Sequence, residues 1–137
     1  KGAILSMKAA LKDAGMQPEE IDYVNVHGTS TPLGDIAELK AVAGVFGDHV
    51  YDLNISSTKS MTGHLLGATG AIEALACILA LTRGVVPPTI NVEELDPEID
   101  AKLNLTLGKA QHRDVKAAMS NTFGFGGHNS TIIFRKF

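Results

Sequence analysis

Segments with helical periodicity alternate along this chain with short apolar segments bounded by turn residues, and this alternation is typical of an α/β fold. Helices are expected to end near Ala14 and to span Asp35–Phe46 and Ala68–Arg83. Strands are expected over Ile21–Val26, Leu53–Thr58, Leu103–Leu107, Val115–Thr122 and Ser130–Phe134. Because helices separate the early strands and only a glycine-rich turn separates the last two, the order suggests a mixed, five-stranded-type sheet flanked by helices.

The chain has 137 residues and no internal repeat or linker, so we expect residues 1–137 to form a single domain. It opens at Lys1 with neither an initiator Met nor a signal-peptide pattern, which suggests that it begins partway through a longer protein. Twelve basic and fifteen acidic residues give a net charge of −3 without a basic cluster, which argues against a nucleic-acid partner. The longest apolar run, Ala74–Leu81, has eight residues and is too short to cross a membrane.

The cysteine and histidine content bears on redox compartment and on metal binding. A single cysteine, Cys77, excludes an internal disulfide and fits a reducing compartment, so we expect a cytoplasmic protein. Its position inside an apolar helix is typical of a buried residue rather than a nucleophile. A zinc site at His27, His64 and His128 is disfavoured because no short ligand spacing is present. No phosphate-loop pattern stands between a strand and a helix, so we expect neither a metal nor a bound cofactor.

Three loops follow predicted strands, and ligands of α/β sheets bind beyond the carboxyl ends of strands. The first, HGTSTP at 27–32, offers an imidazole from His27, a flexible glycine and a run of hydroxyls. Thr31 suits the N-cap of the next helix, with Pro32 at its first position. Capping would use only one residue of this run, which favours a second role for the others.

The second loop, STKSMTGH at 57–64, leads toward the apolar helix over Ala68–Arg83. That helix is apolar on nearly all sides, which predicts burial, and Glu73 is the only acid between 68 and 81. A buried carboxylate costs several kcal/mol unless a cation and hydrogen bonds compensate it. Lys59 is the nearest cation on the strand-end side, so we infer a Lys59–Glu73 pair, which is either a structural tie or an orienting device for catalysis.

The third loop, FGFGGHN at 123–129, carries three glycines, Gly124, Gly126 and Gly127, between the last two predicted strands. Such a loop exposes backbone N–H groups and can form half of an oxyanion hole. The alternative is a tight hairpin turn, which would need only one or two glycines.

Taken in this order, HGTSTP followed by Gly34-Asp35, TKSMTGH at 58–64 and GFGG at 124–127 resemble the motifs of the elongating β-ketoacyl-[acyl-carrier-protein] synthases. Residues 56–73 look more like type II than type I members. The likeness covers this whole chain but only the C-terminal part of the family's chain. Modular polyketide synthases are similar but usually have a glycine where this chain has Ser30.

The resemblance implies a thiolase-like fold, of which this chain would be the C-terminal half. It also implies a decarboxylative Claisen condensation of malonyl-carrier protein with an acyl-enzyme thioester in fatty-acid elongation. The nucleophilic cysteine would lie in the missing N-terminal half, so the fragment alone should be inactive. The implied partners are acyl- and malonyl-loaded acyl carrier protein and a second copy of the synthase in a homodimer, with no role for nucleic acid or membrane.

The resemblance also assigns roles to individual residues. His27 and His64 match the paired catalytic histidines, whose N–H groups stabilise the enolate formed on decarboxylation. Lys59 matches the family lysine and Glu73 its partner glutamate, in agreement with the pair inferred from burial. Thr29 and Thr31 match the threonines that bind the pantetheine arm.

The resemblance also assigns a role to the glycine-rich loop. Phe125 matches a gating aromatic residue whose backbone N–H helps to form the oxyanion hole. Gly124, Gly126 and Gly127 shape this loop, and Asn129 is expected to buttress it. His128 departs from the threonine common in bacterial members.

Two other interpretations of the sequence stay open. Some relatives of the condensing enzymes have lost the cysteine and act as non-catalytic, chain-length-setting partner subunits, although the retained histidines, Lys59 and glycine loop argue against this. A thiolase would need coenzyme A and a second reactive cysteine near the glycine loop, where this chain has none.

Overall fold

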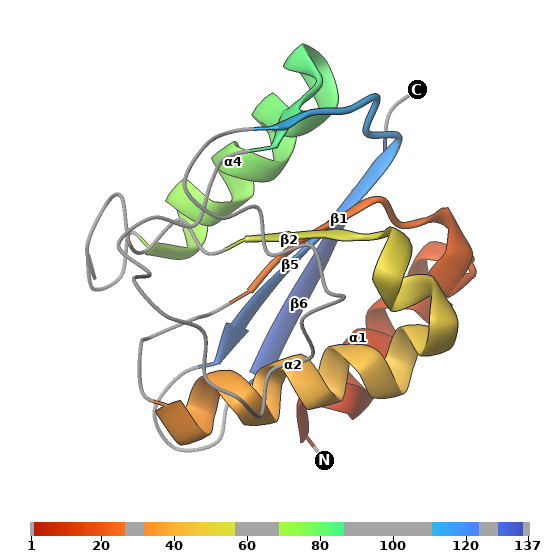
Figure 1. The fold of residues 1–137 in the computed structure, drawn as a ribbon, viewed down its shortest axis with the longest axis vertical. Coiled ribbons are helices and arrows are strands. Elements are labelled where there is room, and N and C mark those ends of the chain that lie inside the picture. Colours follow the sequence, from red (N-terminus) through yellow and green to blue (C-terminus); the bar gives the residue numbers. More distant parts are fainter. Residues whose placement is uncertain (1, 27–31, 57–68, 87–110, 124–128, 136–137) are drawn as a thin grey trace.

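The computed structural model describes residues 2–26, 32–56, 69–86, 111–123 and 129–135, which form an α/β unit (Figure 1). Its helices are α1 (Gly2–Ala14), α2 (Pro32–Phe46) and α4 (Thr69–Arg83), with the short 3₁₀ helices η1 (Pro18–Glu20) and η2 (Gly47–Asp52). Its strands are β1 (Tyr23–Asn25), β2 (Asn54–Ser56), β3 (Val85–Val86), β4 (Gln111–His112), β5 (Ala117–Phe123) and β6 (Asn129–Arg135).

The main sheet has the strand order β2-β1-β5-β6. Strand β1 runs parallel to both β2 and β5, whereas β6 runs antiparallel to β5. A separate antiparallel ribbon joins β3 to β4. The predicted mixed sheet is therefore confirmed with four described strands, and the further strand expected over Leu103–Leu107 lies outside the described residues.

Helices cover the sheet on both faces: α1 and α2 lie against one face and α4 lies against the other (Figure 1). The central strand β1 is buried on both sides, because Val24 packs with the α1 and α2 residues while Tyr23 packs with α4. The larger cluster includes Met7, Leu11, Val42, Phe46 and Met119, and the smaller one includes Cys77, Leu81, Val115 and Ala118. These two apolar layers fix the sheet between its helices.

The described helix ends follow the glycine signals in the sequence. Helix α1 ends at Ala14 and α4 at Arg83, as predicted, and α2 begins at Pro32, the first helical position expected from the HGTSTP segment, three residues before the start of the periodic pattern at Asp35. Gly84 adopts a φ of 66°, a conformation that L side chains rarely adopt, and its carbonyl accepts a 2.8 Å hydrogen bond from the N–H of Arg113. Gly84 therefore ends α4 and turns the chain into the β3–β4 ribbon.

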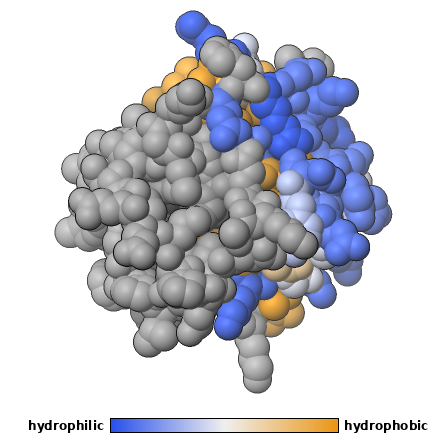
Figure 2. Space-filling view, in the orientation of Figure 1, coloured by the Kyte–Doolittle hydropathy of each residue, from blue (hydrophilic) through white to orange (hydrophobic). Residues whose placement is uncertain are grey.

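Helix α4 is not buried on nearly all sides within the described part of the chain, so that prediction is wrong. Cys77, Ala80 and Leu81 face the sheet, but Leu75 is 53% exposed and Ile78 and Leu79 are exposed as well. One sheet can cover only one face of a helix, which leaves the opposite apolar face uncovered. Figure 2 shows apolar atoms at the end of the molecule that α4 occupies and a hydrophilic surface on the side of α1 and η1.

Among the described helices, none has the length and apolar character needed to span a membrane.

Candidate active site

Three parallel strands end at one edge of the sheet. In the pairing register, Asn25 near the end of β1 lies opposite both Ser56 of β2 and Ser120 of β5. The three motif segments continue from these strands: 27–31 comes after β1, 57–68 after β2, and 124–128 joins β5 to β6. Neighbouring strands are about 4.8 Å apart, so Ser56 and Ser120 flank Asn25 within roughly 10 Å of each other, and β5 continues for three more residues to Phe123. All three segments are thus attached to one edge, where α/β sheets bind ligands.

Most of the predicted site residues themselves lie outside the described part of the chain: His27, Thr29, Thr31, Lys59, His64, Gly124, Phe125, Gly126 and Gly127. Glu73 lies within α4 and Asn129 opens β6, where it pairs with Phe123, but only their backbone is described. The convergence of the two imidazoles and the Lys59–Glu73 pair therefore remain predictions. What the structure shows is the placement of the strands and helices to which these residues are attached.

Two described helices begin directly after the motif segments. Helix α2 starts at Pro32 and α4 starts at Thr69, immediately after 27–31 and 57–68. The N-terminal end of a helix carries a partial positive charge and free backbone N–H groups. Both helix starts would therefore favour negative charge on a ligand or reaction intermediate held near this edge.

Beneath the motif segments the strands carry buried polar side chains that sequence reasoning did not single out. Asn25 and Asn121 are fully buried and Ser120 nearly so. The Nδ2 group of Asn25 donates a 3.0 Å hydrogen bond to the hydroxyl of Tyr23. The only signal in the sequence was the presence of amides inside apolar strands, because buried amides require such partners.

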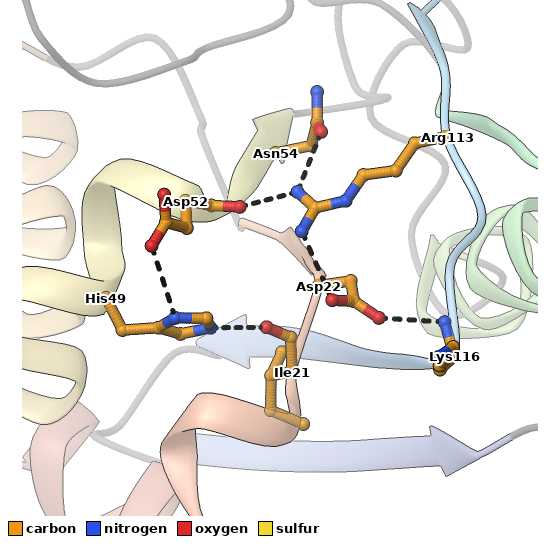
Figure 3. Close-up of polar contacts among 7 residues, drawn as sticks. All are labelled: Ile21, Asp22, His49, Asp52, Asn54, Arg113 and Lys116. Atoms are coloured by element: carbon orange, nitrogen blue, oxygen red, sulfur yellow. Dashed lines mark hydrogen bonds and ion pairs between the residues drawn. The ribbon is translucent and has the colours of Figure 1, made fainter.

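The opposite edge of the sheet is held by the guanidinium of Arg113 (Figure 3). Its Nη1 donates to the backbone oxygen of Asp52 at 2.6 Å and to Oδ1 of Asn54 at 3.1 Å, while Nη2 lies 3.1 Å from Oδ1 of Asp22. The other carboxylate oxygen of Asp22 accepts the backbone N–H of Lys116 at 2.8 Å. The side chains of Arg113 and Asp22 together connect the amino-terminal ends of β1, β2 and β5.

His49 belongs to this same edge of the sheet. Its Nε2 donates a 2.8 Å hydrogen bond to the carbonyl of Ile21, and its side chain is only 15% exposed. The bond joins η2 to the segment before β1 (Figure 3). His49 is thus a structural residue remote from the motif segments.

Cys77 is fully buried, as predicted, and its thiol donates a weak 3.9 Å contact to the carbonyl of Met119. It faces the core between α4 and β5, so it is not placed as a nucleophile. Within the described ranges, no three His, Cys, Asp or Glu side chains are grouped as metal ligands.

The comparisons with known proteins agree with this topology. Residues 1–93 match the family described as Beta-ketoacyl synthase, C-terminal domain, and the chain belongs to this family. It is 50% identical over all of its 137 residues to 3-oxoacyl-[acyl-carrier-protein] synthase 2 of Synechocystis sp., of which it covers 32%. The chain thus spans about a third of the curated relatives it matches.

Solved structures show the same fold. A β-ketoacyl synthase from Burkholderia phymatum superposes with a TM-score of 0.90 at 44% identity, over 98% of this chain and 32% of that one. A chain of the complex between a type II polyketide acyl-carrier protein and its ketosynthase, bound to the hexaketide, superposes with a TM-score of 0.92 at 36% identity. The match covers 98% of this chain and 33% of that chain. The α/β fold and the mixed sheet flanked by helices are therefore those of the ketosynthase C-terminal domain.

Proposed function

We propose that this chain is the C-terminal half of an elongating 3-oxoacyl-[acyl-carrier-protein] synthase. The observation that carries the proposal is the common edge of β2, β1 and β5, from which all three motif segments leave. The 50% identity to a 3-oxoacyl-[acyl-carrier-protein] synthase 2 supports the same class of reaction. Metal and cofactor chemistry have no part in the reaction as proposed.

In the proposed reaction, malonyl-carrier protein loses carbon dioxide, and the electron pair of the broken carbon–carbon bond forms an enolate. His27 and His64 donate N–H hydrogen bonds to the thioester oxygen on which the charge develops. The enolate carbon then attacks the acyl-enzyme carbonyl, a carbon–carbon bond forms, and the cysteine thiolate leaves. The glycine-rich segment 124–128 supplies backbone N–H groups to the oxygen of the acyl-enzyme thioester. Thr29 and Thr31 bind the pantetheine arm, and Lys59 with Glu73 orients this side of the site.

The nucleophilic cysteine is proposed to lie in an N-terminal half that this chain lacks, so the chain alone would be inactive. The chain covers about a third of the curated relatives, so most of their length lies outside the part that matches it, which is compatible with a nucleophile elsewhere in the longer protein. The exposed apolar side chains of α4 suit contact with further protein. We propose that the whole synthase is a cytoplasmic homodimer and that it receives its substrates from an acyl carrier protein. The complex of a related ketosynthase with its carrier protein supports the proposed interaction with a carrier protein.

The test uses the longer synthase with His27→Ala and His64→Ala. Each variant should lose malonyl decarboxylation by about 10²–10³-fold, the usual cost of removing one donor to an oxyanion. Acylation of the cysteine should survive better. The matched control is His49→Gln, because this imidazole lies at the opposite edge of the sheet. Decarboxylation at the parental rate in both alanine variants would contradict the assignment. A parent that decarboxylates malonyl-carrier protein but has no cysteine to acylate would be the chain-length-setting partner instead.

A further inference from the structure

A chain of polar contacts crosses the core where β5 and β6 meet α1. The side chain of Asn121 is fully buried next to Met7 and Met119, which are also fully buried. Its Oδ1 lies 2.9 Å from the hydroxyl of Thr131, and that hydroxyl lies 2.8 Å from the hydroxyl of Ser6 on α1. Its Nδ2 donates to the sulfur of Met7 at 3.4 Å. The hairpin of β5 and β6 is thus joined to α1, more than 100 residues earlier in the sequence, by one continuous set of hydrogen bonds.

The chemistry of the groups fixes the direction of these bonds. The amide oxygen of Asn121 can only accept, so the hydroxyl of Thr131 uses its single hydrogen there. The hydroxyl of Ser6 must then donate to Thr131, since Thr131 has only lone pairs left. Loss of the Thr131 hydroxyl would leave the buried Asn121 oxygen without this donor and would also break the link to α1.

The Asn121–Thr131 contact also defines the register of the hairpin. The two residues are directly paired in the antiparallel ladder, two positions before Phe123 pairs with Asn129. A shift of one residue in one direction would bring Ile132 opposite Asn121, and the side chain of Ile132 belongs to the other face of the sheet. A glycine-rich turn imposes little register of its own because glycine accepts many backbone conformations. Apolar pairs such as Met119 with Ile133 and Ala118 with Phe134 favour the same register, and the polar pair adds a specific buried hydrogen bond to it.

We propose that Asn121 and Thr131 are positioning residues for the glycine-rich segment 124–128. They hold β5 and β6 in the register that presents the backbone N–H groups of this segment to the acyl-enzyme thioester, and Ser6 ties the pair to α1. This inference rests on the proposed function of segment 124–128. The pair acts through the hairpin, about three residues or roughly 10 Å along the strands from the segment, and does not touch substrate.

The test can be specific because the two chemical steps are assigned to different groups. Enolate stabilisation is assigned to His27 and His64, whereas acyl transfer is assigned to segment 124–128. Misplacement of that segment should therefore lower acyl transfer to the cysteine and spare malonyl decarboxylation. A merely structural role would lower both rates together, in proportion to the folded fraction.

The experiment compares Thr131→Val and Thr131→Ser in the longer synthase, with rates expressed per folded molecule. Thr131→Val, which keeps the shape but removes the hydroxyl, should slow acyl transfer about tenfold or more and decarboxylation less than about twofold. Thr131→Ser restores the hydroxyl and should restore acyl transfer. The control is Asp22→Asn, which weakens the opposite edge and should not separate the two rates.

Equal losses of both rates in Thr131→Val, or no loss in either, would overturn the inference. If the parental protein itself carries out neither reaction, the proposed function fails instead. Hydrogen exchange of the β5 and β6 amides then still tests the register. Faster exchange along this hairpin in Thr131→Val, but not in Asp22→Asn, supports a register set by the pair, and unchanged exchange refutes it.

Discussion

Asp22 and Arg113, 91 residues apart in sequence, form an ion pair at 3.1 Å where the amino-terminal ends of β1 and β5 meet. Both side chains are largely buried, at 20% and 28% exposure. The strands β1 and β2 pair over only three residues, so their ladder alone holds them weakly. The guanidinium of Arg113 adds contacts to the backbone of Asp52 and the side chain of Asn54, and these connect β2 to the same ion pair.

Replacement of Arg113 by lysine should lower the free energy of unfolding by about 1–3 kcal/mol. An ammonium group retains the charge but cannot make the forked set of contacts to three separate acceptors. Urea denaturation of the parent, R113K, D22N and the double variant measures this loss and the coupling between the two residues. The control is Asp52→Asn, because Arg113 contacts the backbone oxygen of Asp52 and not its exposed carboxylate. An additive double-variant cycle would contradict the pairing.

Alanine at Gly84 should destabilise the protein more than alanine at Gly15. Both glycines have positive φ, 66° and 67°, so both substitutions carry the strain of a left-handed residue, about 1–2 kcal/mol. A Cβ at Gly84 would also approach the carbonyl oxygen of Arg113 to 3.2 Å, whereas a Cβ at Gly15 would meet nothing within 4 Å. Melting temperatures of the two variants isolate the steric contribution, and equal losses would argue against the close approach.

Cys77 should resist thiol reagents in the native protein. Its side chain is fully buried between α4 and β5, so a bulky disulfide reagent reaches the sulfur only when this part of the core opens. The rate of labelling by Ellman's reagent should rise steeply through the urea unfolding transition. Immediate labelling in the absence of denaturant would show that α4 is not packed as described.

The predicted Lys59–Glu73 pair can be separated into structural and catalytic contributions by thermal stability. If the pair is a structural tie, Lys59→Ala and Glu73→Ala should each lower the melting temperature, and the double variant should lose less than the sum. If the pair orients the site, the melting temperatures should stay near the parental value while condensation by the longer synthase falls. Full additivity of the two single changes in both measurements would mean that the residues do not interact.

The elements were predictable from the sequence where local chemistry decides them. Gly15 and Gly84 marked the ends of α1 and α4, and the structure has those ends at Ala14 and Arg83. The bounds of the strands were less well predicted: Ile21–Val26 was expected where β1 spans Tyr23–Asn25, and Ser130–Phe134 was expected where β6 spans Asn129–Arg135. A strand ends where its partners stop pairing, and no local pattern carries that information.

The polar contacts within the core could not be predicted, because each joins residues far apart in sequence. Arg113 had no distinguishing neighbours, and Asn121 was one amide within an apolar strand. The exposure of Leu75 was missed for a related reason: periodicity shows that a face is apolar but does not show what covers it. The motif loops, in contrast, stood out in the sequence because several unusual residue types occur together at each strand end.

The two edges of the sheet carry different groups of residues, and this separation is useful for engineering. The side chains that fasten β1, β2 and β5 together around Arg113 lie at the amino-terminal edge, whereas the three motif segments leave from the other. Exchange of segments 27–31, 57–68 and 124–128 with those of other members of the family would keep the described contacts of that guanidinium. Chimeras built on this base would compare different motif segments on one set of strand contacts.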